Sequence, residues 1–325
     1  MRHSRIKPSI FAILLASLLL TVSQISASQA DSPTHSLSLQ DAPPGTFETP
    51  IPSLQIPHTG SPEYYQVTLF NTTVHTVIID LTDSHTTFGI MTADGATPPC
   101  CDTWSQGTWT DNQTHLKTVP QMWNSSQFPN KVAAVNGDYF VDPGNGAPLG
   151  EFTRWHTPSG RVRQYQYNGD FAAMIVKDWD GARYPVLFRV SRQGVDSGTK
   201  LVMGGGPIIK IVNGQVQYNP SDERTHLAPP SGRGANDRRG RTAACVDQDT
   251  WHLYLLAVWK PFPNSGQGLT GLEMGEVMKA WGCERGMEFD GGPSTTMVFR
   301  GNVKIENWPG PGARPIGGSF LVGYN

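Results

Sequence analysis

The apolar positions of this chain fall in short runs separated by turn-forming residues, a pattern that predicts β-strands through most of the region after residue 63. The dipeptide Asn213-Gly214 lies between two such runs and favours a two-residue hairpin turn, and Gly301 with Asn302 marks another turn. Strands are predicted within 67–81 and at 131–135, 208–212, 215–218, 242–246, 251–259, 297–299, 303–305 and 320–322. The chain is therefore expected to be rich in antiparallel strands.

One segment shows helical periodicity instead. Thr270, with Glu273 three residues later, forms a capping box, and Gly282 marks the end of the helix. The apolar residues at helical spacing between them are Met274, Val277, Met278 and Trp281. A single amphipathic helix among many strands predicts an α+β fold, with a mixed, largely antiparallel β-sheet core, few helices packed on it and many loops. Residues 92–130 are predicted to form one long polar and aromatic loop.

The N-terminal residues 1–30 have the pattern of a cleaved export signal: basic residues, an apolar run at 10–22 and small residues before position 31. The apolar run is shorter than the roughly 20 residues that span a bilayer, so we expect no stable membrane insertion after cleavage, with an uncleaved anchor as the alternative. Residues 31–62 are predicted to be a linker or arm, and 63–325 a single domain. The protein is thus expected to be secreted, periplasmic or on the cell surface.

Composition narrows the partners that the chain can have. A formal net charge of -2 gives no reason to expect a nucleic acid partner. The 35 glycines, 26 prolines and 9 tryptophans, with only 16% charged residues, are typical of exported strand-rich proteins that handle carbohydrate. None of the nine histidines lies at metal-ligand spacing from a cysteine or another histidine, so no zinc site and no cofactor is predicted; a divalent cation stays open.

Four cysteines are present in a chain that is expected to meet an oxidising compartment. One or two disulfides are predicted, and three complete pairings of Cys100, Cys101, Cys245 and Cys283 exist. The alternative is that Cys245 and Cys283 are small buried residues with free thiols.

The segment 288–297 places acids and hydroxyls around a glycine turn between two apolar runs. Glu288 and Asp290 are two apart on a predicted strand, so their carboxylates leave the same face with Cα atoms roughly 6.6 Å apart. Such a pair raises the pKa of one member unless a cation intervenes, and serves as acid and base, as nucleophile and partner, or as a metal site. The alternative is a strand end whose acids accept hydrogen bonds from the turn.

The residues after Asp290 are candidates for ligand contact. The amides of Gly291 and Gly292 are expected to form an anion-binding nest, and the hydroxyls of Ser294 and Thr295 to donate to an anion or a sugar. The alternative is that these hydroxyls close the turn locally.

A second polar cluster follows the predicted strand at 131–135. Asn136, Gly137 and Asp138 precede Tyr139, and the amide of Asn136 suits sugar hydroxyls while Tyr139 would line a pocket. The alternative is capping of a turn by Asn136 and Asp138. We expect this cluster and the Asp290 segment to share one cleft.

Arginines gather between the two clusters. Arg241 opens an apolar strand, where its planar guanidinium can be fixed to bind phosphate. Arg233, Arg238 and Arg239 are predicted to be solvated loop residues.

Taken in order, these segments resemble the phosphodiester glycosidase family, which includes the lysosomal enzyme that removes N-acetylglucosamine from a phosphodiester to mannose. The matching residues are Asn136, Gly137, Tyr139, Phe140, Pro148, Gly150, Gly205, Gly206, Pro207, Asn213, Arg241, Thr242, Ala243, Gly268, Leu269, Thr270, Asp290, Gly291, Gly292, Ser294, Thr296 and Met297. The chain departs from the family pattern at Asp138, Glu288, Pro293 and Thr295. The resemblance adds Gly205, Gly206 and Thr242 to the expected substrate-binding residues.

The resemblance implies a hydrolase that cleaves the glycosidic bond of a sugar phosphodiester and releases a sugar and a phosphate monoester. Asp290 is expected to activate water or attack the anomeric centre, with Glu288 tuning it or acting as the acid and Arg241 holding the phosphate. The alternatives are a non-catalytic module that binds cell-wall polysaccharide or another anionic glycan in the same cleft, and a metal-dependent phosphodiesterase.

Overall fold

The structure is a computed structural model. It describes residues 35–38, 54, 60, 62–92, 116–140, 152–156, 161–165, 171–191, 198–218, 236–259, 267–308 and 312–325. The predicted export signal, the Cys100-Cys101 pair and Arg233 lie outside these residues.

Within the described residues the strands form three sheets, of which the largest has eight strands in the order β1-β2-β3-β14-β13-β15-β11-β12. Its strands are β1 (His35–Ser38), β2 (Glu63–Leu69), β3 (Thr72–Asp80), β14 (His252–Val258), β13 (Arg241–Asp247), β15 (Arg285–Glu288), β11 (Ile208–Val212) and β12 (Gln215–Tyr218). Neighbouring strands are antiparallel except for β1 and β2, which are parallel.

The other two sheets have five strands each within the described residues, in the orders β7-β6-β10-β8-β9 and β17-β16-β5-β18-β4. Their bounds are β7 (Arg161–Tyr165), β6 (Phe152–His156), β10 (Thr199–Gly205), β8 (Phe171–Lys177), β9 (Val186–Ser191), β17 (Asn302–Glu306), β16 (Thr296–Phe299), β5 (Lys131–Asn136), β18 (Gly318–Tyr324) and β4 (Thr86–Thr92). One hydrophobic cluster takes buried side chains from all three sheets, among them Leu255, Met174 and Phe320. The shared core therefore lies where the three sheets face one another.

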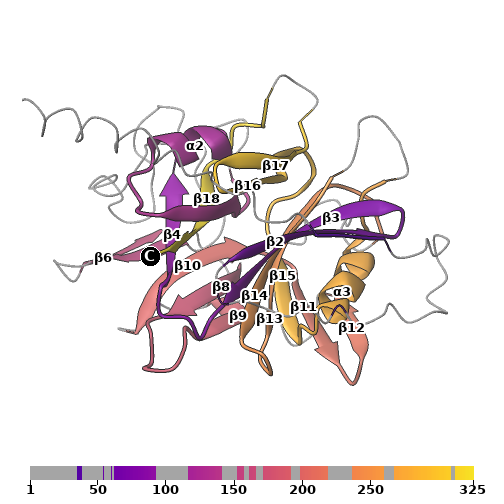
Figure 1. Ribbon diagram of the computed structural model, residues 1–325, viewed down its shortest axis with the longest axis horizontal. Helices are drawn as coiled ribbons and strands as arrows, with labels where there is room; N and C mark the ends of the chain where they lie inside the picture. The colour runs from indigo at the N-terminus through magenta and orange to yellow at the C-terminus, as the bar shows by residue number, and fades with distance from the viewer. Residues whose placement is uncertain are drawn as a thin grey trace, which may run out of the picture. The chain divides into compact units, whose positions relative to one another are not determined.

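Two α-helices cover outer faces of these sheets, among the described residues. Helix α3 (Gly271–Ala280) packs against β11 and β12, and helix α2 (Val119–Ser125) contacts β5 and β16 (Figure 1). The predicted capping box of α3 is confirmed, since Thr270 accepts from the Glu273 amide and the Glu273 carboxylate accepts from the Thr270 amide. The sheet-rich α+β fold predicted from the sequence is thus confirmed.

The sequence predicted one long loop over residues 92–130. This prediction is wrong near the C-terminal end of the range, where the chain forms helix α2. The helix begins with a second capping box, in which Thr118 and Gln121 satisfy each other's backbone amides, and Pro120 lies in the first turn. This signal is present in the sequence. The helix is only two turns long, so its buried residues Val119, Met122 and Trp123 give too short a pattern to show a period.

Both predicted hairpins are confirmed, although the turn of the second lies at a slightly different position from the predicted one. Asn213 and Gly214 both have positive φ, 51° and 72°, as the two-residue turn between β11 and β12 requires. Between β16 and β17 the residues with positive φ are Arg300 and Gly301, at 48° and 78°, so the turn lies one residue earlier than predicted.

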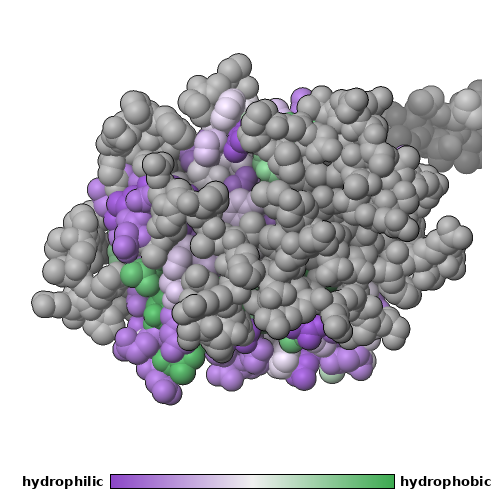
Figure 2. Space-filling view, turned by 180° about the vertical axis from the view of Figure 1, so that it is seen from behind, coloured by the Kyte–Doolittle hydropathy of each residue, from purple (hydrophilic) through white to green (hydrophobic). Residues whose placement is uncertain are grey.

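Before the predicted domain, β1 pairs with β2 and forms an edge of the eight-stranded sheet, and the amide of the buried Leu54 donates to the Ala280 carbonyl oxygen. On the face opposite to that of Figure 1, the described residues are mostly hydrophilic with a few hydrophobic residues among them (Figure 2).

No helix among the described residues has the length and apolarity needed to cross a membrane.

Cys245 on β13 and Cys283 after α3 form a disulfide. The alternative of two buried free thiols is therefore wrong. The bond links the strand that begins at Arg241 to the chain segment between α3 and β15, and so ties together the elements that carry Arg241 and Glu288.

Removing this disulfide is expected to destabilise the protein. The two cysteines are 38 residues apart in the sequence. Opening a loop of this size lowers the free energy of unfolding by about 3–4 kcal/mol, because the unfolded chain gains entropy. The measurement is denaturant unfolding of Cys245→Ala/Cys283→Ala against the oxidised protein. Equal unfolding midpoints would contradict the expectation.

Candidate active site

Three segments far apart in the sequence meet where β5, β13 and β15 end or begin. β5 ends at Asn136, β13 begins at Arg241, and β15 ends at Glu288, which pairs with Ala243 of β13. Beyond β15, the Asp290 amide donates to the Gly137 carbonyl oxygen. The predicted meeting of the two polar clusters is thus seen in the structure.

Asn136 joins these segments through its amide. Its Nδ2 donates to the Asp290 carbonyl oxygen at 2.6 Å, while its Oδ1 accepts from Thr242 Oγ1 at 2.6 Å and from the Thr296 amide at 3.0 Å. The side chain is fully buried. Asn136 therefore positions Asp290 and the adjoining strands, and its contact with a sugar stays a prediction that this placement does not favour.

A pocket of about 230 Å³ opens at this junction. The described residues that line it are Tyr139, Pro207, Tyr218, Arg239, Arg241, Glu288, Phe289, Asp290, Gly291, Gly292, Pro293 and Arg314. Three guanidinium groups thus face two carboxylates, which favours a ligand that carries negative charge.

Glu288 and Arg241 form a buried ion pair at the pocket wall. Arg241 Nη1 donates to both Glu288 carboxylate oxygens, at 2.8 and 2.6 Å, and the side chains of Arg241 and Glu288 are 3% and 5% exposed. The rest of the Arg241 guanidinium donates to backbone oxygens, from Nε to Leu269 and from Nη2 to Asp237. Arg241 is therefore mainly the partner of Glu288, and its predicted grip on phosphate stays a prediction.

Burial raises the pKa of the Glu288 carboxyl above its usual value, and the Arg241 charge opposes this rise. Tyr218 also contacts the carboxylate, with its hydroxyl donating to Oε2 at 3.3 Å. Burial is the main cause of the raised pKa of the Tyr218 hydroxyl, so Tyr218 stays a neutral donor. The perturbation of Glu288 thus comes from desolvation rather than from repulsion by Asp290.

Asp290 differs from Glu288 in its exposure. β15 ends at Glu288, so the prediction that both acids lie on one strand is wrong, although both line the pocket. Asp290 is half-buried, whereas Glu288 is 4% exposed. Its backbone is fixed on both sides, by the Gly137 carbonyl oxygen and by Asn136. Asp290 is therefore the carboxylate that a ligand can reach.

Of the two amides in the predicted anion nest after Asp290, that of Gly292 is engaged within the protein, so the nest as a whole stays a prediction. The Gly292 amide donates to the Gly240 carbonyl oxygen at 2.7 Å, and Pro293 has no N–H group. Ser294 closes a short 3-10 turn, η2 (Gly292–Ser294), and its side chain is fully buried, as is that of Thr295. Ser294 Oγ accepts from Arg314 Nη1 at 3.0 Å, and the buried Thr295 Oγ1 has no hydrogen-bond partner among the described residues, so ligand contact by these hydroxyls stays a prediction.

Other residues of the predicted site contact the backbone of the residues that form the pocket wall. A Cβ atom on Gly205 would lie 2.6 Å from the Glu288 carbonyl oxygen, so only glycine fits there. The Gly206 amide donates to that same oxygen, and Tyr139 Oη donates to the Gly206 carbonyl oxygen at 3.1 Å. The predicted residues that do not line the pocket are Asn136, Gly137, Asp138, Gly205, Gly206, Thr242, Ser294 and Thr295.

Six lining residues were not among the predicted site residues: Pro207, Tyr218, Arg239, Phe289, Pro293 and Arg314. Arg238 and Arg239 lie in a loop, as predicted, but both are only partly exposed. Arg238 donates to the Glu273 carboxylate at 2.6 Å, and the backbone of Arg239 exchanges two hydrogen bonds with that of Leu269. The grouping of arginines was a usable signal, whereas nothing in the sequence around Arg314 indicates a site.

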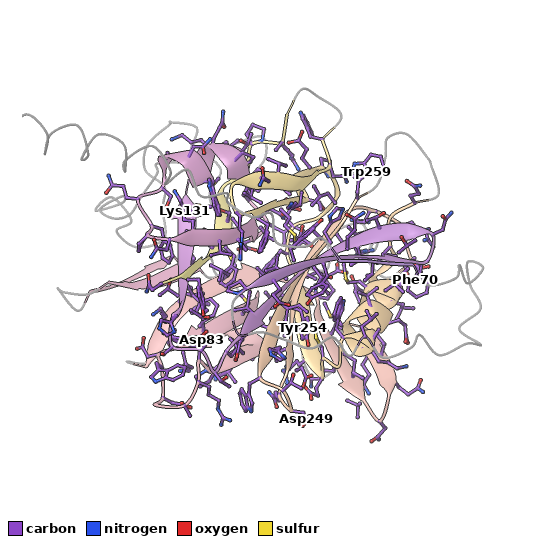
Figure 3. The ribbon with its side chains drawn as sticks, viewed as in Figure 1. Phe70, Asp83, Lys131, Asp249, Tyr254 and Trp259 are labelled. Atoms are coloured by element: carbon purple, nitrogen blue, oxygen red, sulfur yellow. A yellow bond between two sulfur atoms is a disulfide. The ribbon has the colours of Figure 1, made fainter. Side chains whose placement is uncertain are left out.

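A second acidic group lies at the other end of the β13–β14 hairpin. Asp247, Asp249 and Glu284 place carboxylate oxygens within 4.8 Å of one another. Figure 3 shows Asp249 in the hairpin turn and Trp259 at the far end of β14, which is the end where Arg241 pairs with Val258. Asp247 accepts the amides of Asp249 and Thr250, so the turn itself explains this residue. The group is separate from the pocket, and the absence of a cofactor stays a prediction.

A half-buried carboxylate that lines a pocket beside guanidinium groups, on a sheet-rich scaffold, defines a site suited to reactions of anionic substrates. The family model for phosphodiester glycosidases matches residues 129–323, and the chain belongs to the phosphodiester glycosidase family. Enzymes of this family are glycosidases that act on phosphodiesters.

One solved structure supports this fold. The catalytic domain of zebrafish N-acetylglucosamine-1-phosphodiester alpha-N-acetylglucosaminidase, auto-inhibited by its pro-peptide, superimposes with a TM-score of 0.55 at 15% identity, over 84% of this chain and 87% of that one. A hypothetical protein from Synechocystis gives a TM-score of 0.49 at 14% identity, over 82% of this chain and 64% of that one. The chain thus spans less than two thirds of the Synechocystis protein. A comparison with curated proteins gives no match.

Proposed function

We propose that this enzyme hydrolyses the bond between the anomeric carbon and the phosphate oxygen of a sugar phosphodiester. The observation that carries this proposal is the difference between the two carboxylates. Of the described residues that line the pocket, only Glu288 and Asp290 carry carboxylates, and both oxygens of Glu288 are held by Arg241. The site therefore offers one accessible carboxylate.

One carboxylate suffices only for a particular class of leaving group. Most glycosidases use two, because an alkoxide departs slowly unless an acid protonates it. A phosphate monoester leaves as a stable anion whose second pKa is about 6, so its departure needs little protonation. Guanidinium groups stabilise the charge that develops on it. The single reachable carboxylate of Asp290 thus fits a phosphodiester better than an ordinary glycoside.

In this reaction Asp290 removes a proton from water, and the water oxygen bonds to the anomeric carbon. The electron pair of the C–O bond leaves with the phosphate monoester, which takes up the proton when Asp290 releases it. Glu288 and Arg241 hold the wall of the pocket through their ion pair, and Asn136 fixes the backbone of Asp290. Direct attack by Asp290 on the anomeric carbon, with a later hydrolysis step, is the other chemistry that this placement supports.

Export of the enzyme is also part of the proposal. The N-terminal pattern supports export, after which the enzyme would act on envelope or extracellular glycans.

A metal-dependent phosphodiesterase is the second candidate, since cleavage at phosphorus commonly uses two metal ions. The lining residues favour it less, because Arg241 occupies the carboxylate that such a site would need.

Hydrolysis in ¹⁸O-labelled water separates the candidates. The substrates are methyl phosphodiesters of hexose and N-acetylhexosamine 1-phosphates. Cleavage at the anomeric carbon is expected to place the label in the released sugar and to continue in EDTA. Label in the phosphate, with loss of turnover in EDTA, would favour the metal-dependent phosphodiesterase. Binding without any release across the panel would favour the non-catalytic module.

A further inference from the structure

Asn307, directly after β17, is a buried asparagine that contacts the turn after Asp290. The residue is 2% exposed, and its Nδ2 donates to the Gly292 carbonyl oxygen at 2.7 Å. At the other end of the same turn, Asn136 donates from Nδ2 to the Asp290 carbonyl oxygen at 2.6 Å. Two carboxamides from different strand ends therefore hold the backbone on either side of Gly291.

The two asparagines flank the start of β16, the strand to which this turn leads. β16 lies between β17 and β5 and is antiparallel to both, so its first residues face the last residues of its two neighbours. Thr296 pairs with Glu306, and its amide donates to Asn136 Oδ1. The Asn307 amide continues this ladder by donating to the Thr295 carbonyl oxygen at 3.0 Å. The sheet thus fixes the backbone of Asn307.

The contact between Asn307 and the turn also reaches the segment before Arg241. The Gly292 amide donates to the Gly240 carbonyl oxygen at 2.7 Å, so Asn307, Gly292 and Gly240 are joined by consecutive hydrogen bonds. A Cβ atom on Gly240 would collide with Asn307 Nδ2 and would lie 3.0 Å from the Gly292 carbonyl oxygen. Because the three segments are packed this closely, a change at Asn307 is transmitted to the turn.

We propose that Asn307 is a positioning residue for the carboxylate of Asp290. The inference rests on the proposed function, in which Asp290 activates the water. Asn307 does not line the pocket, and it acts through the backbone two residues after Asp290. Holding the Gly292 carbonyl oxygen in place fixes the direction in which the Asp290 side chain leaves the turn. A displacement of about 1 Å in a reacting group can lower a rate about 100-fold.

Asn307→Ala tests this role, because it removes the donor to Gly292 without adding a charge. We expect kcat to fall about 10- to 100-fold, while KM changes by less than about threefold, because Asn307 contacts no substrate.

The matched control is Asn302→Ala. Asn302 lies at the other end of β17 and also donates from Nδ2 to a backbone carbonyl oxygen, that of Arg300. It is exposed and lies outside the pocket lining, so this variant should keep the kcat of the unchanged protein.

A double-mutant cycle with Asp290→Asn separates positioning from a general loss of stability. If Asn307 acts through the Asp290 carboxylate, Asn307→Ala should change the residual rate of Asp290→Asn by less than about twofold, whereas independent effects would multiply. Circular dichroism spectra and unfolding midpoints show whether each variant is folded at the assay temperature.

Hydrogen exchange measures the turn itself and needs no turnover. In Asn307→Ala the amide of Gly292 is expected to exchange about 10-fold faster, because loss of one hydrogen bond makes local opening of the turn easier. Mass spectrometry of peptides that cover residues 288–296 gives this rate. Asn302→Ala should leave it unchanged.

An unchanged kcat in folded Asn307→Ala would overturn the inference, and so would full multiplication of the two effects in the double variant. Faster exchange in the turn of a protein that releases no sugar would reject the proposed function and keep the hold of Asn307 on the turn. Sugar release that is indifferent to Asn307 would do the reverse.

Discussion

Replacing Asp290 with asparagine is expected to lower kcat by about 10²- to 10⁴-fold, the usual contribution of a positioned general base. Asparagine keeps the shape of the side chain and removes the charge that accepts the proton of water. The backbone contacts of Asp290 with Gly137 and Asn136 do not involve the carboxylate, so they remain. Because the residue is half-buried, the free energy of unfolding should change by no more than about 0.5 kcal/mol.

The matched control for this variant is Asp249→Asn. Asp249 is an exposed acid in the turn between β13 and β14, at the end of the hairpin that lies away from the pocket. It should keep full turnover. Initial rates of sugar release at saturating substrate compare the three proteins, and near-normal kcat in Asp290→Asn would reject Asp290 as the base.

The second large effect concerns the buried ion pair. Arg241→Met is expected to lower the free energy of unfolding by about 3–5 kcal/mol, because the Glu288 carboxylate is left buried without a cation. Replacing both residues, as Arg241→Met/Glu288→Met, removes the charge as well as its partner, and such apolar replacements are often neutral. The double variant should therefore be more stable than the single one.

Urea unfolding of the single and double variants measures this difference. If Arg241→Met expresses too poorly to measure, recovery of soluble protein in the double variant still reports the same energetic order. A single variant as stable as the unchanged protein would show that the pair contributes nothing to the fold.

The elements that were predicted are those whose signals are local. The hairpin at Asn213-Gly214 needs two adjacent residues of positive φ, and asparagine with glycine meets that need. The capping box of α3 depends on two residues three positions apart. The two-turn α2 has its own box at Thr118 and was missed, because a helix so short shows little apolar periodicity.

The site was predicted in part, for a related reason. Glu288 and Asp290 come directly before a glycine turn, so one short stretch of sequence was enough to indicate a candidate active site. The roles of Asn136 and Arg241 depend on what lies across the fold, on β13 and β15, so the sequence showed the residues without their partners. Arg314 enters the pocket only through the path of the chain before β18, for which no local pattern exists.

The hydrogen bonds that Arg241 donates to both Glu288 carboxylate oxygens also limit which polymers around such an enzyme could be its substrates. With Glu288 engaged by Arg241, the described lining residues offer no second free carboxyl group to protonate an alkoxide, so the glycosidic linkages of structural polysaccharides would persist in its presence. An exported catalyst built this way could trim phosphate-linked decorations and spare the scaffold that carries them.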